Sequence, residues 1–547
     1  MTARPLLILV GATILCLAPF ADKAFHIDDP LFLWAARHIL SDPVDFYGFG
    51  VNWYGTDMAM STVFKNPPLT SYSIALVASL VGWSEVALHL AFLVPAAAAA
   101  VGTYVLARRC CSHPLAAALV GLFTPAFLVS GTSVMSDTMM LALWVWTVAL
   151  WLHGLERNDP RALIGSAVLL ALCALTKYYG MSLIPLLLVY SLARRRRPGW
   201  WALCLLLPAG ALALYQWATY ALYGRGLLFD AASYATNVRY LNGSQLLIKG
   251  LIGLAFAGGS LATIALYTPL LWSRRLCAAG ILLVAVLTFT LPAAEKLGGF
   301  ALIDADGVRW GPVIQLALFA TAGISPLALA GADLRSRRDA ASLLLFLWVA
   351  GTFVFASFLN WSVNVRSILP MAPAAGILVM RRIEARGAVA PGRRWRVLWP
   401  LVPGACVALL VAWTDYSLAN TARSVAAEIH DRYRNRPGTV WFQGHWGFQY
   451  YMEARGGKAL DRRRSRLAPG DIVVIPANNT NVFAMPPGGT PLSHVIERPV
   501  PGWLATMSTS VGAGFYSDIW GPLPFSVGAV PAERYAVLTV SEEIHLR

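Results

Sequence analysis

The sequence predicts a multi-pass α-helical membrane protein with a small α/β domain at its C-terminal end. Three observations support this prediction: apolar segments of membrane-crossing length recur, charged residues are scarce, and arginines gather between alternate apolar segments. Of the 547 residues, 57% are hydrophobic and 13% are charged. Soluble proteins carry roughly 25% charged residues. So few charges suit loops between membrane helices better than the surfaces of several soluble domains.

The apolar segments have the length that a helix needs to cross a hydrocarbon core about 30 Å thick, roughly 18 to 22 residues. We expect about thirteen spans, near 5–22, 86–107, 115–132, 134–153, 161–176, 178–193, 200–222, 247–272, 276–293, 311–331, 341–358, 366–380 and 397–414. A shorter apolar segment at 69–83 follows Pro67-Pro68, and we expect it to form a helix at the membrane interface.

Arginine clusters between the spans predict the orientation. They include Arg108-Arg109, Arg157 and Arg161, Arg194 to Arg197, Arg274-Arg275, Arg335 with Arg337-Arg338, and Arg381-Arg382 through Arg396. All of them, with Arg4, fall on one side of the predicted membrane, which the positive-inside rule makes cytoplasmic. The N-terminus is then cytoplasmic and the C-terminal domain periplasmic or extracellular. Because the basic residues are spread over short turns, the net charge of +15 does not indicate nucleic-acid binding.

The first apolar segment has the composition of a signal peptide, but we expect it to remain as the first span. A cut after Ala24 would place Asp22 at the −3 position, which signal peptidase disfavours. The seven cysteines fall in spans or at cytoplasmic ends, so the sequence predicts no disulfide framework.

Two domains are expected. Residues 1–415 form the membrane domain, whose longest outside loop is 23–85, and residues 416–547 form the outside domain. The latter contains short β-like runs at 439–442, 472–475 and 535–540, separated by turn signals, which indicates a small α/β domain.

The first outside loop opens with two adjacent carboxylates, Asp28 and Asp29, followed by Pro30. A helix is expected from Pro30, and Asp29 would then suit an N-cap. A carboxylate held at a membrane interface can also act as a general base, because partial desolvation raises its basicity. Both aspartates are therefore catalytic candidates.

The order of several short motifs resembles the GT-C glycosyltransferases that use polyprenyl-phosphate sugars, above all the protein O-mannosyltransferases and the bacterial lipid A aminoarabinose transferases. The similar motifs are Asp28-Asp29, where the family has Asp-Glu, Lys65-Asn66-Pro67-Pro68-Leu69, Ser136-Asp137, Leu175-Thr176-Lys177-Tyr178, and Arg366-Ser367-Ile368-Leu369-Pro370, which lacks the family's Tyr. The resemblance covers about residues 5–415 and does not reach the C-terminal domain.

The resemblance implies an inverting transfer from a polyprenyl-phosphate sugar to an acceptor at the outer face of the cytoplasmic membrane. It implies that Asp28 is the base, with Asp29 beside it. Lys65, Lys177 and Arg366 would hold the donor phosphate, since a leaving phosphate needs cations as its charge grows. Asp137 would organise the site. No metal and no cofactor are expected, and the partners would be the donor, a lipid, glycan or protein acceptor, and the bilayer.

Each candidate also has a structural explanation. Asp28 could pair with Lys23 or with a helix terminus, and Asp137 could cap its helix. Lys177 could extend to the interface as flanking lysines do, and Arg366 could pair with Asp304 or Asp306. His26, beside the aspartates, is more typical of a local hydrogen-bonding residue.

Aromatic residues occur at two places of the predicted outer side. Trp53, Tyr54 and Trp361 are typical of an interfacial belt, which occurs regardless of function. The stretch 441–451 is dense in aromatic and amide side chains. That composition suits carbohydrate contact, and it equally suits a small core or a docking face.

Two further functions remain open. A transporter or lipid-linked sugar flippase would place charged residues near the bilayer midplane, whereas here the acidic residues cluster at outer helix ends. A non-catalytic envelope assembly protein would not need the aspartate pair together with Lys177 and Arg366. The sequence favours the enzyme and identifies neither the sugar nor the acceptor.

Overall fold

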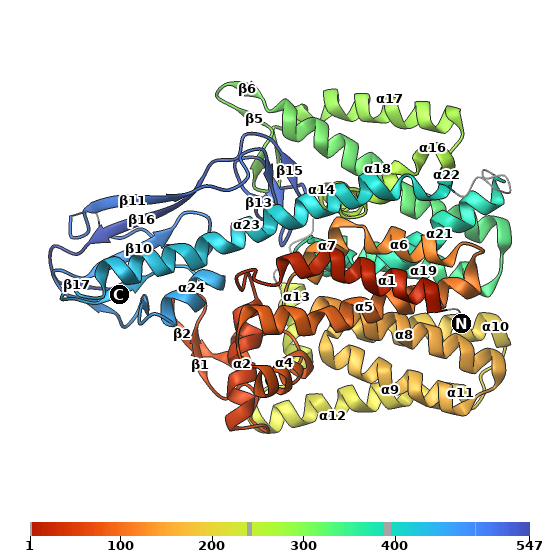
Figure 1. Cartoon of the computed structure of the whole chain (residues 1–547), viewed down its shortest axis with the longest axis horizontal. Coiled ribbons are helices and arrows are strands. Elements are labelled where there is room, and N and C mark those ends of the chain that lie inside the picture. Colours follow the sequence, from red (N-terminus) through yellow and green to blue (C-terminus); the bar gives the residue numbers. More distant parts are fainter. Residues whose placement is uncertain (1–2, 238–242, 388–394, 487, 547) are drawn as a thin grey trace.

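The computed structural model describes residues 3–237, 243–387, 395–486 and 488–546. Its helices form an elongated bundle, and a smaller, mostly β domain stands at one end of it (Figure 1). The N-terminal end of the chain lies at the opposite end of the bundle. The predicted architecture, a multi-pass helical bundle with a C-terminal α/β domain, is confirmed.

Eight helical segments of the described chain are long and apolar enough to cross a membrane alone. They are α1 (Ala3–Leu17) with η1 (Ala18–Phe20), α5 (Glu85–Cys110), α8 (Ser136–Arg157), α11 (Trp201–Cys204) with α12 (Leu206–Tyr223), α17 (Arg274–Thr290) with η3 (Leu291–Ala294), α18 (Trp310–Arg337), α19 (Ala340–Val354) with the π-helical turn η4 (Phe355–Leu359), and α23 (Leu401–Tyr433).

The other five predicted spans are helical but short or interrupted. They are α6 (Pro114–Leu122) with α7 (Pro125–Gly131), α9 (Pro160–Thr176), η2 (Tyr178–Ser182) with α10 (Leu183–Arg195), α14 (Gly243–Ser260) with α15 (Ala262–Leu266) and α16 (Thr268–Leu271), and α20 (Val365–Ile368) with α21 (Met371–Ala385). Helices α6 and α7 meet at 65°, because Thr124 caps α7 and Pro125 occupies its first turn. A separate short helix, α22 (Trp395–Leu398), precedes α23.

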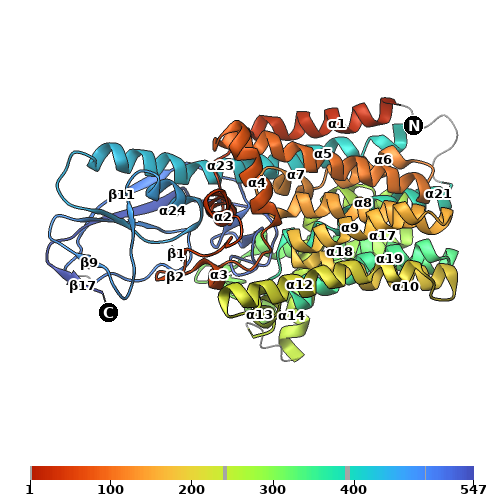
Figure 2. The same cartoon turned by 90° about the horizontal axis from the view of Figure 1, so that it is seen from below.

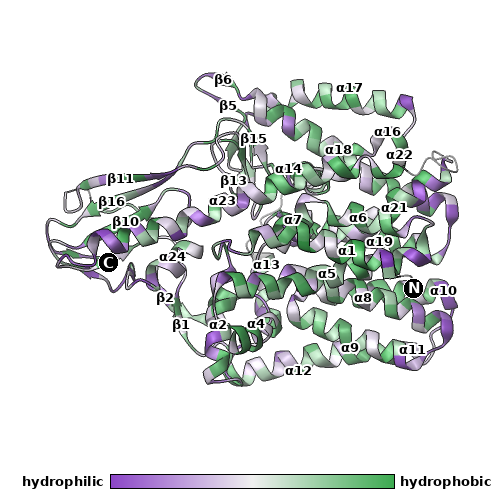
Figure 3. Cartoon of the chain, in the orientation of Figure 1, coloured by the Kyte–Doolittle hydropathy of each residue, from purple (hydrophilic) through white to green (hydrophobic). Residues whose placement is uncertain are grey.

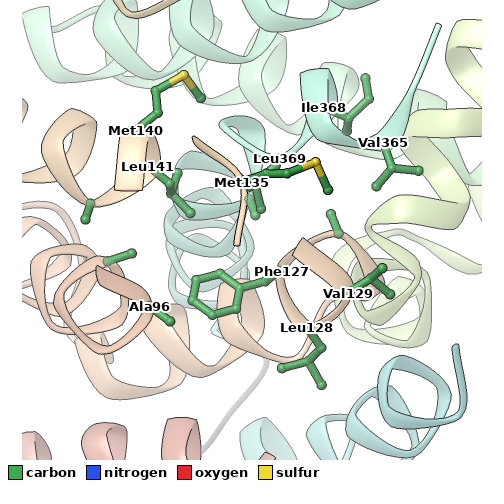
Figure 4. Close-up of a cluster of buried hydrophobic side chains, with 14 of the residues drawn as sticks. Ala96, Phe127, Leu128, Val129, Met135, Met140, Leu141, Val365, Ile368 and Leu369 are labelled. Atoms are coloured by element: carbon green, nitrogen blue, oxygen red, sulfur yellow. The ribbon is translucent and has the colours of Figure 1, made fainter. Parts of the chain in front are cut away.

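Small residues let the helices of the bundle approach closely. A side chain at Gly376 on α21 would clash with the carbonyl oxygen of Ala117 on α6, and one at Gly323 on α18 would clash with that of Leu254 on α14. Such contacts are typical of membrane bundles, where close packing replaces the hydrophobic effect as the driving force. The packed centre includes Phe127, Met135, Leu141, Val365, Ile368 and Leu369 (Figure 4).

The two ends of the bundle differ in charge. Arginines gather at the final turns of α5, α8, α10, α18 and α21, and hydrophilic colour marks the end of the bundle away from the C-terminal domain (Figure 3). The arginine clusters therefore lie opposite the end that carries the first loop and the C-terminal domain.

The first loop packs beside the C-terminal domain (Figure 2). It contains α2 (Asp29–Ser41), strands β1 (Gly50–Asn52) and β2 (Asp57–Ala59), and α3 (Met60–Val63). The predicted interfacial helix is α4 (Leu69–Val81), which packs against α2. The 223–246 loop contains α13 (Leu227–Asn237). Two small hairpins, β3 (Lys296–Leu297) with β4 (Phe300–Ala301) and β5 (Ile303–Asp304) with β6 (Gly307–Val308), precede α18.

The C-terminal domain is built on a five-stranded mixed sheet in the order β11-β16-β10-β7-β8. Its strands are β7 (Val440–Phe442), β8 (Lys458–Ala459), β10 (Ile472–Pro476), β11 (Leu492–Arg498) and β16 (Glu533–Thr539), with α24 (Trp446–Glu453) between β7 and β8. Shorter strand pairs are β9 (Arg466–Leu467) with β17 (Ile544–His545), β12 (Leu504–Ala505) with β15 (Ser526–Val527), and β13 (Met507–Ser508) with β14 (Ala513–Gly514). All three predicted strands are present, whereas β8 and β11 of this sheet and the shorter strand pairs were not predicted. Helix α23 continues from the bundle across residue 415 to Tyr433 and packs on α24.

Candidate active site

A cavity of about 1460 Å³ lies where the bundle meets the C-terminal domain. Four of the six predicted site residues line it: Asp28, Lys65, Lys177 and Arg366. Asp29 and Asp137 do not line it, since both are buried, with at most 1% of the side chain exposed. The structure thus gathers at one place residues that lie far apart in the sequence.

Four charged side chains form a chain of contacts along the cavity wall. Arg366 donates from Nη2 to Oδ2 of Asp28 at 2.9 Å, and its Nη1 lies 4.0 Å from Oδ2 of Asp137. Lys177 donates from Nζ to the other oxygen of Asp137 at 2.5 Å. Two carboxylates and two cations therefore alternate, and Asp137 holds both cations from behind.

Local structure explains how each of these groups reaches the cavity. Asp137 lies in the first turn of α8, where the helix dipole favours a negative charge. Lys177 occupies the extended break between α9 and η2. Arg366 lies in the short α20, whose N-terminus is capped by the side chain of Asn364, and its Nη1 also contacts Sδ of Met135 at 2.8 Å. Met135 belongs to the buried cluster that supports this wall (Figure 4).

Asp29 begins α2 and faces the protein interior rather than the cavity. Its Oδ2 accepts a hydrogen bond from the His26 amide at 2.8 Å, and its Oδ1 accepts one from the Val134 amide at 2.9 Å. Burial raises the pKa of this carboxyl to about 7. Asp29 therefore joins the loop before Asp28 to the segment before α8. Ile27, which lies between His26 and Asp28, has a φ of +48°. This backbone conformation is strained for a β-branched residue, and such strain is typical of functional sites.

The alternative pairings proposed from sequence for Asp28 and Arg366 are wrong. Lys23 pairs with Asp415 at 2.6 Å, with both side chains fully buried, and is thus not the partner of Asp28. Arg366 pairs with Asp28, whereas Asp304 lies 3.6 Å from Arg309.

Lys65 lines the same cavity and belongs to a second charged group, whose other members, Asp230 and Arg225, are not among the lining residues. Its Nζ donates to Asp230 at 2.5 Å, and Arg225 pairs with the other oxygen of Asp230. The ammonium also lies 5.6 Å from the ring centre of Tyr234. Sequence reasoning missed Asp230 and Arg225, which flank the beginning of α13. Their only sequence signal is that oppositely charged residues occur together in the 223–246 loop.

The cavity also has an apolar side between α10 and α12. Its lining residues on η2 and α10 are Met181, Ile184 and Pro185. Those on α12 are Ala209, Ala213 and Trp217. Met181 and Trp217 are exposed on the outside of the bundle. The charged wall is thus continuous with an apolar groove that reaches the surface expected to face lipid.

The C-terminal domain closes the cavity on another side. It contributes two groups of residues, His445, Trp446, Thr480 and Asn481, and Met507, Tyr516, Ser517, Ile519 and Trp520. The second group is tied to the bundle, because Tyr516 and Thr506 donate to Asp415, the partner of Lys23, at 2.8 and 3.1 Å. Of these residues, the sequence analysis singled out only His445 and Trp446, as part of the aromatic stretch 441–451.

Among the described residues, no group of three or more His, Cys, Asp or Glu side chains is placed to hold a metal ion. The charged side chains that line the cavity are Lys65, Lys177, Arg366 and Asp28. Their ion-pair network adds Asp137, Asp230 and Arg225, which do not line it, so the described network holds four cations and three carboxylates. Such a wall suits a ligand that carries one negative charge.

Comparison with solved structures gives the fold. The chain is similar to ArnT from Cupriavidus metallidurans bound to undecaprenyl phosphate, with a TM-score of 0.50, 14% identity, and coverage of 87% of this chain and 94% of that chain. The chain has the GT-C fold. The oligosaccharyltransferase of Archaeoglobus fulgidus in the apo form is similar at a TM-score of 0.48 and 12% identity, over 83% of this chain and 64% of that one.

One family model matches part of the chain. Residues 65–223 match the family model described as dolichyl-phosphate-mannose-protein mannosyltransferase, which is less than a third of the chain. Lys65, Asp137 and Lys177 lie within that range, and Asp28, Asp29 and Arg366 lie outside it. No curated protein matches the chain significantly.

Proposed function

We propose that this protein is a membrane glycosyltransferase that moves a sugar from a polyprenyl-phosphate carrier to an acceptor at the outer face of the cytoplasmic membrane. The observation that carries the proposal is the meeting of Asp28, Lys177 and Arg366 in one cavity that continues into an apolar groove. A lipid-linked sugar phosphate needs a charged site for its phosphate beside an apolar groove for its lipid.

The apolar groove between α10 and α12 suits the polyprenyl chain, which would reach it from the bilayer. Its phosphate would then lie against Lys177 and Arg366, with Lys65 as a further cation. The phosphodiester carries one negative charge and gains a second as the bond to the sugar breaks. Cations already fixed by Asp137 stabilise that growing charge without reorganising.

Asp28 is the proposed general base. Its side chain is 25% exposed, and among the described residues its ion pair with Arg366 engages Oδ2. It would take the proton of the acceptor hydroxyl as the oxygen attacks the anomeric carbon from the side opposite the phosphate, and the configuration would invert. Asp29 positions the loop through its two backbone hydrogen bonds, and Asp137 organises the two cations.

A flippase for lipid-linked sugars is the second candidate, because the GT-C neighbour ArnT was solved with undecaprenyl phosphate bound. The clustering of the charged site at one end of the bundle, beside the C-terminal domain, favours the enzyme. The arginine-rich opposite end would face the cytoplasm by the positive-inside rule.

One assay separates the two functions. The protein is reconstituted in vesicles with undecaprenyl phosphates that carry radiolabelled mannose, aminoarabinose, galacturonic acid or a pentose, and envelope extract is supplied as the acceptor source. We expect one donor to release free undecaprenyl phosphate as its label moves to an acceptor. Movement of an intact donor between leaflets without cleavage would support the flippase instead.

A further inference from the structure

The wall that the C-terminal domain contributes to the cavity contains paired aromatic rings. Trp446 lies edge-on to Trp520, with ring centres 5.9 Å apart, and both indoles are only partly buried. The ring of His445 lies 4.9 Å from that of Trp446 and 4.5 Å from that of Trp53 in the first loop. All four residues line the cavity. The C-terminal domain and the first loop thus form one aromatic surface.

The backbone holds Trp446 in a strained conformation that aims the turn at this surface. Its φ is +65°, which is uncommon for a bulky residue and is energetically unfavourable. Asn479 secures the turn, since its Oδ1 accepts from the His445 amide at 3.0 Å and its Nδ2 donates to the His445 carbonyl at 3.1 Å. Strain that is kept by specific bonds points to a function for the turn.

The same turn lies directly on the segment that leads to Asp28. A side chain at Gly447 would clash with the carbonyl oxygen of Phe25, and the Phe25 amide donates to the hydroxyl of Tyr451 on α24 at 2.8 Å. The aromatic surface is therefore fixed relative to the proposed base. It lies on the C-terminal side of the cavity, whereas the groove for the lipid lies between α10 and α12.

Polar groups accompany the rings. His445 is 3% exposed, and its Nε2 lies 3.0 Å from the hydroxyl of Thr480. Its Nδ1 has no hydrogen-bond partner among the residues that the structure describes. Burial lowers the pKa of this imidazole to about 3, so it is neutral at physiological pH, and Nδ1 is left to donate or accept one hydrogen bond according to the tautomer. Asn481 adds an amide to the same wall.

We propose that Trp446, Trp520 and His445 form the acceptor subsite and that the acceptor is a carbohydrate. The negative face of an aromatic ring attracts polarised C–H bonds, and one face of a pyranose presents several of them. The neutral imidazole and the amide suit sugar hydroxyls, and the described wall carries no charge that would select a charged peptide. This inference rests on the proposed function, since it names the substrate that Asp28 would deprotonate.

The test measures binding without turnover. Saturation-transfer NMR with purified protein in detergent compares methyl α-mannoside and α-mannotriose with a peptide of serine, threonine and glycine. Trp446→Asn removes the indole while Asn tolerates a positive φ, and the matched control is Trp503→Asn, at an exposed tryptophan of the same domain outside the cavity. We expect saccharide binding that falls about tenfold in Trp446→Asn and in Trp520→Ala and is unchanged in Trp503→Asn.

Three results would overturn the proposal: binding of the peptide in place of the saccharides, saccharide binding that all variants retain, or an equal loss in Trp503→Asn. A second arm tests whether Trp446 contacts the donor sugar instead. If Trp446→Asn weakens binding of undecaprenyl-phosphate mannose but not of undecaprenyl phosphate, the acceptor assignment is wrong. Asp28→Asn should keep saccharide binding. If the wild type transfers no sugar but still binds saccharide in a way that depends on Trp446, the proposed transferase function is wrong while the proposed saccharide site is supported.

Discussion

Arg366 and Asp28 form an ion pair at 2.9 Å although 338 residues separate them in the sequence. The pair joins the proposed base to the proposed phosphate ligands, because the same guanidinium lies 4.0 Å from Asp137. The proposed acid–base and phosphate-binding roles would therefore be linked through one guanidinium, and most of the predictions below depend on that link.

Arg366→Lys should lower kcat/KM for the donor about tenfold to a hundredfold. A lysine keeps the charge but loses the planar fork that reaches Asp28 and Asp137 together. The measurement is the rate of undecaprenyl phosphate release with the active donor. Arg309→Lys, at an arginine of the same end that lies 3.6 Å from Asp304, is the control. Equal rates in Arg366→Lys and wild type would contradict a bridging role.

Lys177→Met should destabilise the protein by about 3 kcal/mol, because it removes the closest cation from the buried carboxylate of Asp137. The double variant Lys177→Met with Asp137→Asn should recover most of that stability but not donor binding. Thermal unfolding in detergent and binding of undecaprenyl phosphate measure the two effects. Donor affinity that returns with stability would show that Lys177 is structural only.

Asp29 should make stability depend on pH. Burial raises its pKa to about 7, above the unfolded value of about 3.9, so the folded state binds the extra proton between these values. Its contribution to stability is then full below about pH 4 and is lost as pH rises to 7, by up to about 1.4 kcal/mol per unit. Asp29→Asn should flatten the melting temperature between pH 5 and 8. An unchanged slope would contradict the assignment, and Glu533, whose pKa burial also raises to about 7, gives a comparison through Glu533→Gln.

Gly447→Ala should slow transfer at least tenfold, because the added methyl group meets the carbonyl oxygen of Phe25 and displaces the turn from the segment before Asp28. Gly502→Ala, where a methyl group would make only ordinary contact with Val530, should be active. Transfer rates of the two variants at matched protein levels are the measurement. Full activity in Gly447→Ala would show that close contact between the turn and the first loop is dispensable.

Much of this arrangement could be predicted from the sequence because its signals are local. Apolar runs of membrane length and the arginines between them predict the bundle, and short motifs at helix ends predict Asp28, Lys177 and Arg366. The break between α6 and α7 was not predicted, although Thr124 and Pro125 carry its signal. Hydropathy averaged over a segment of membrane-crossing length does not reveal such a break.

Contacts between distant segments account for what the sequence could not supply. Lys23 and Asp415 lie 392 residues apart, and nothing near either residue predicts that they meet. Tyr516 and Trp520 sit in a loop without a recognisable motif, and only the folded C-terminal domain brings them to the cavity. The sequence made both aspartates catalytic candidates with Asp28 as the base, and only the structure shows that Asp28 lines the cavity while Asp29, at the start of α2, is buried.

The role of Asp28 as the base is tested most directly by comparing donor cleavage by Asp28→Asn and by Asp42→Asn, at an exposed carboxylate of the same loop. Both variants would be studied at equal protein levels, with undecaprenyl phosphate binding as the check on folding. We expect Asp28→Asn to bind the lipid but to lose at least a hundredfold in transfer rate, and Asp42→Asn to resemble wild type. Wild-type transfer by Asp28→Asn would contradict that role.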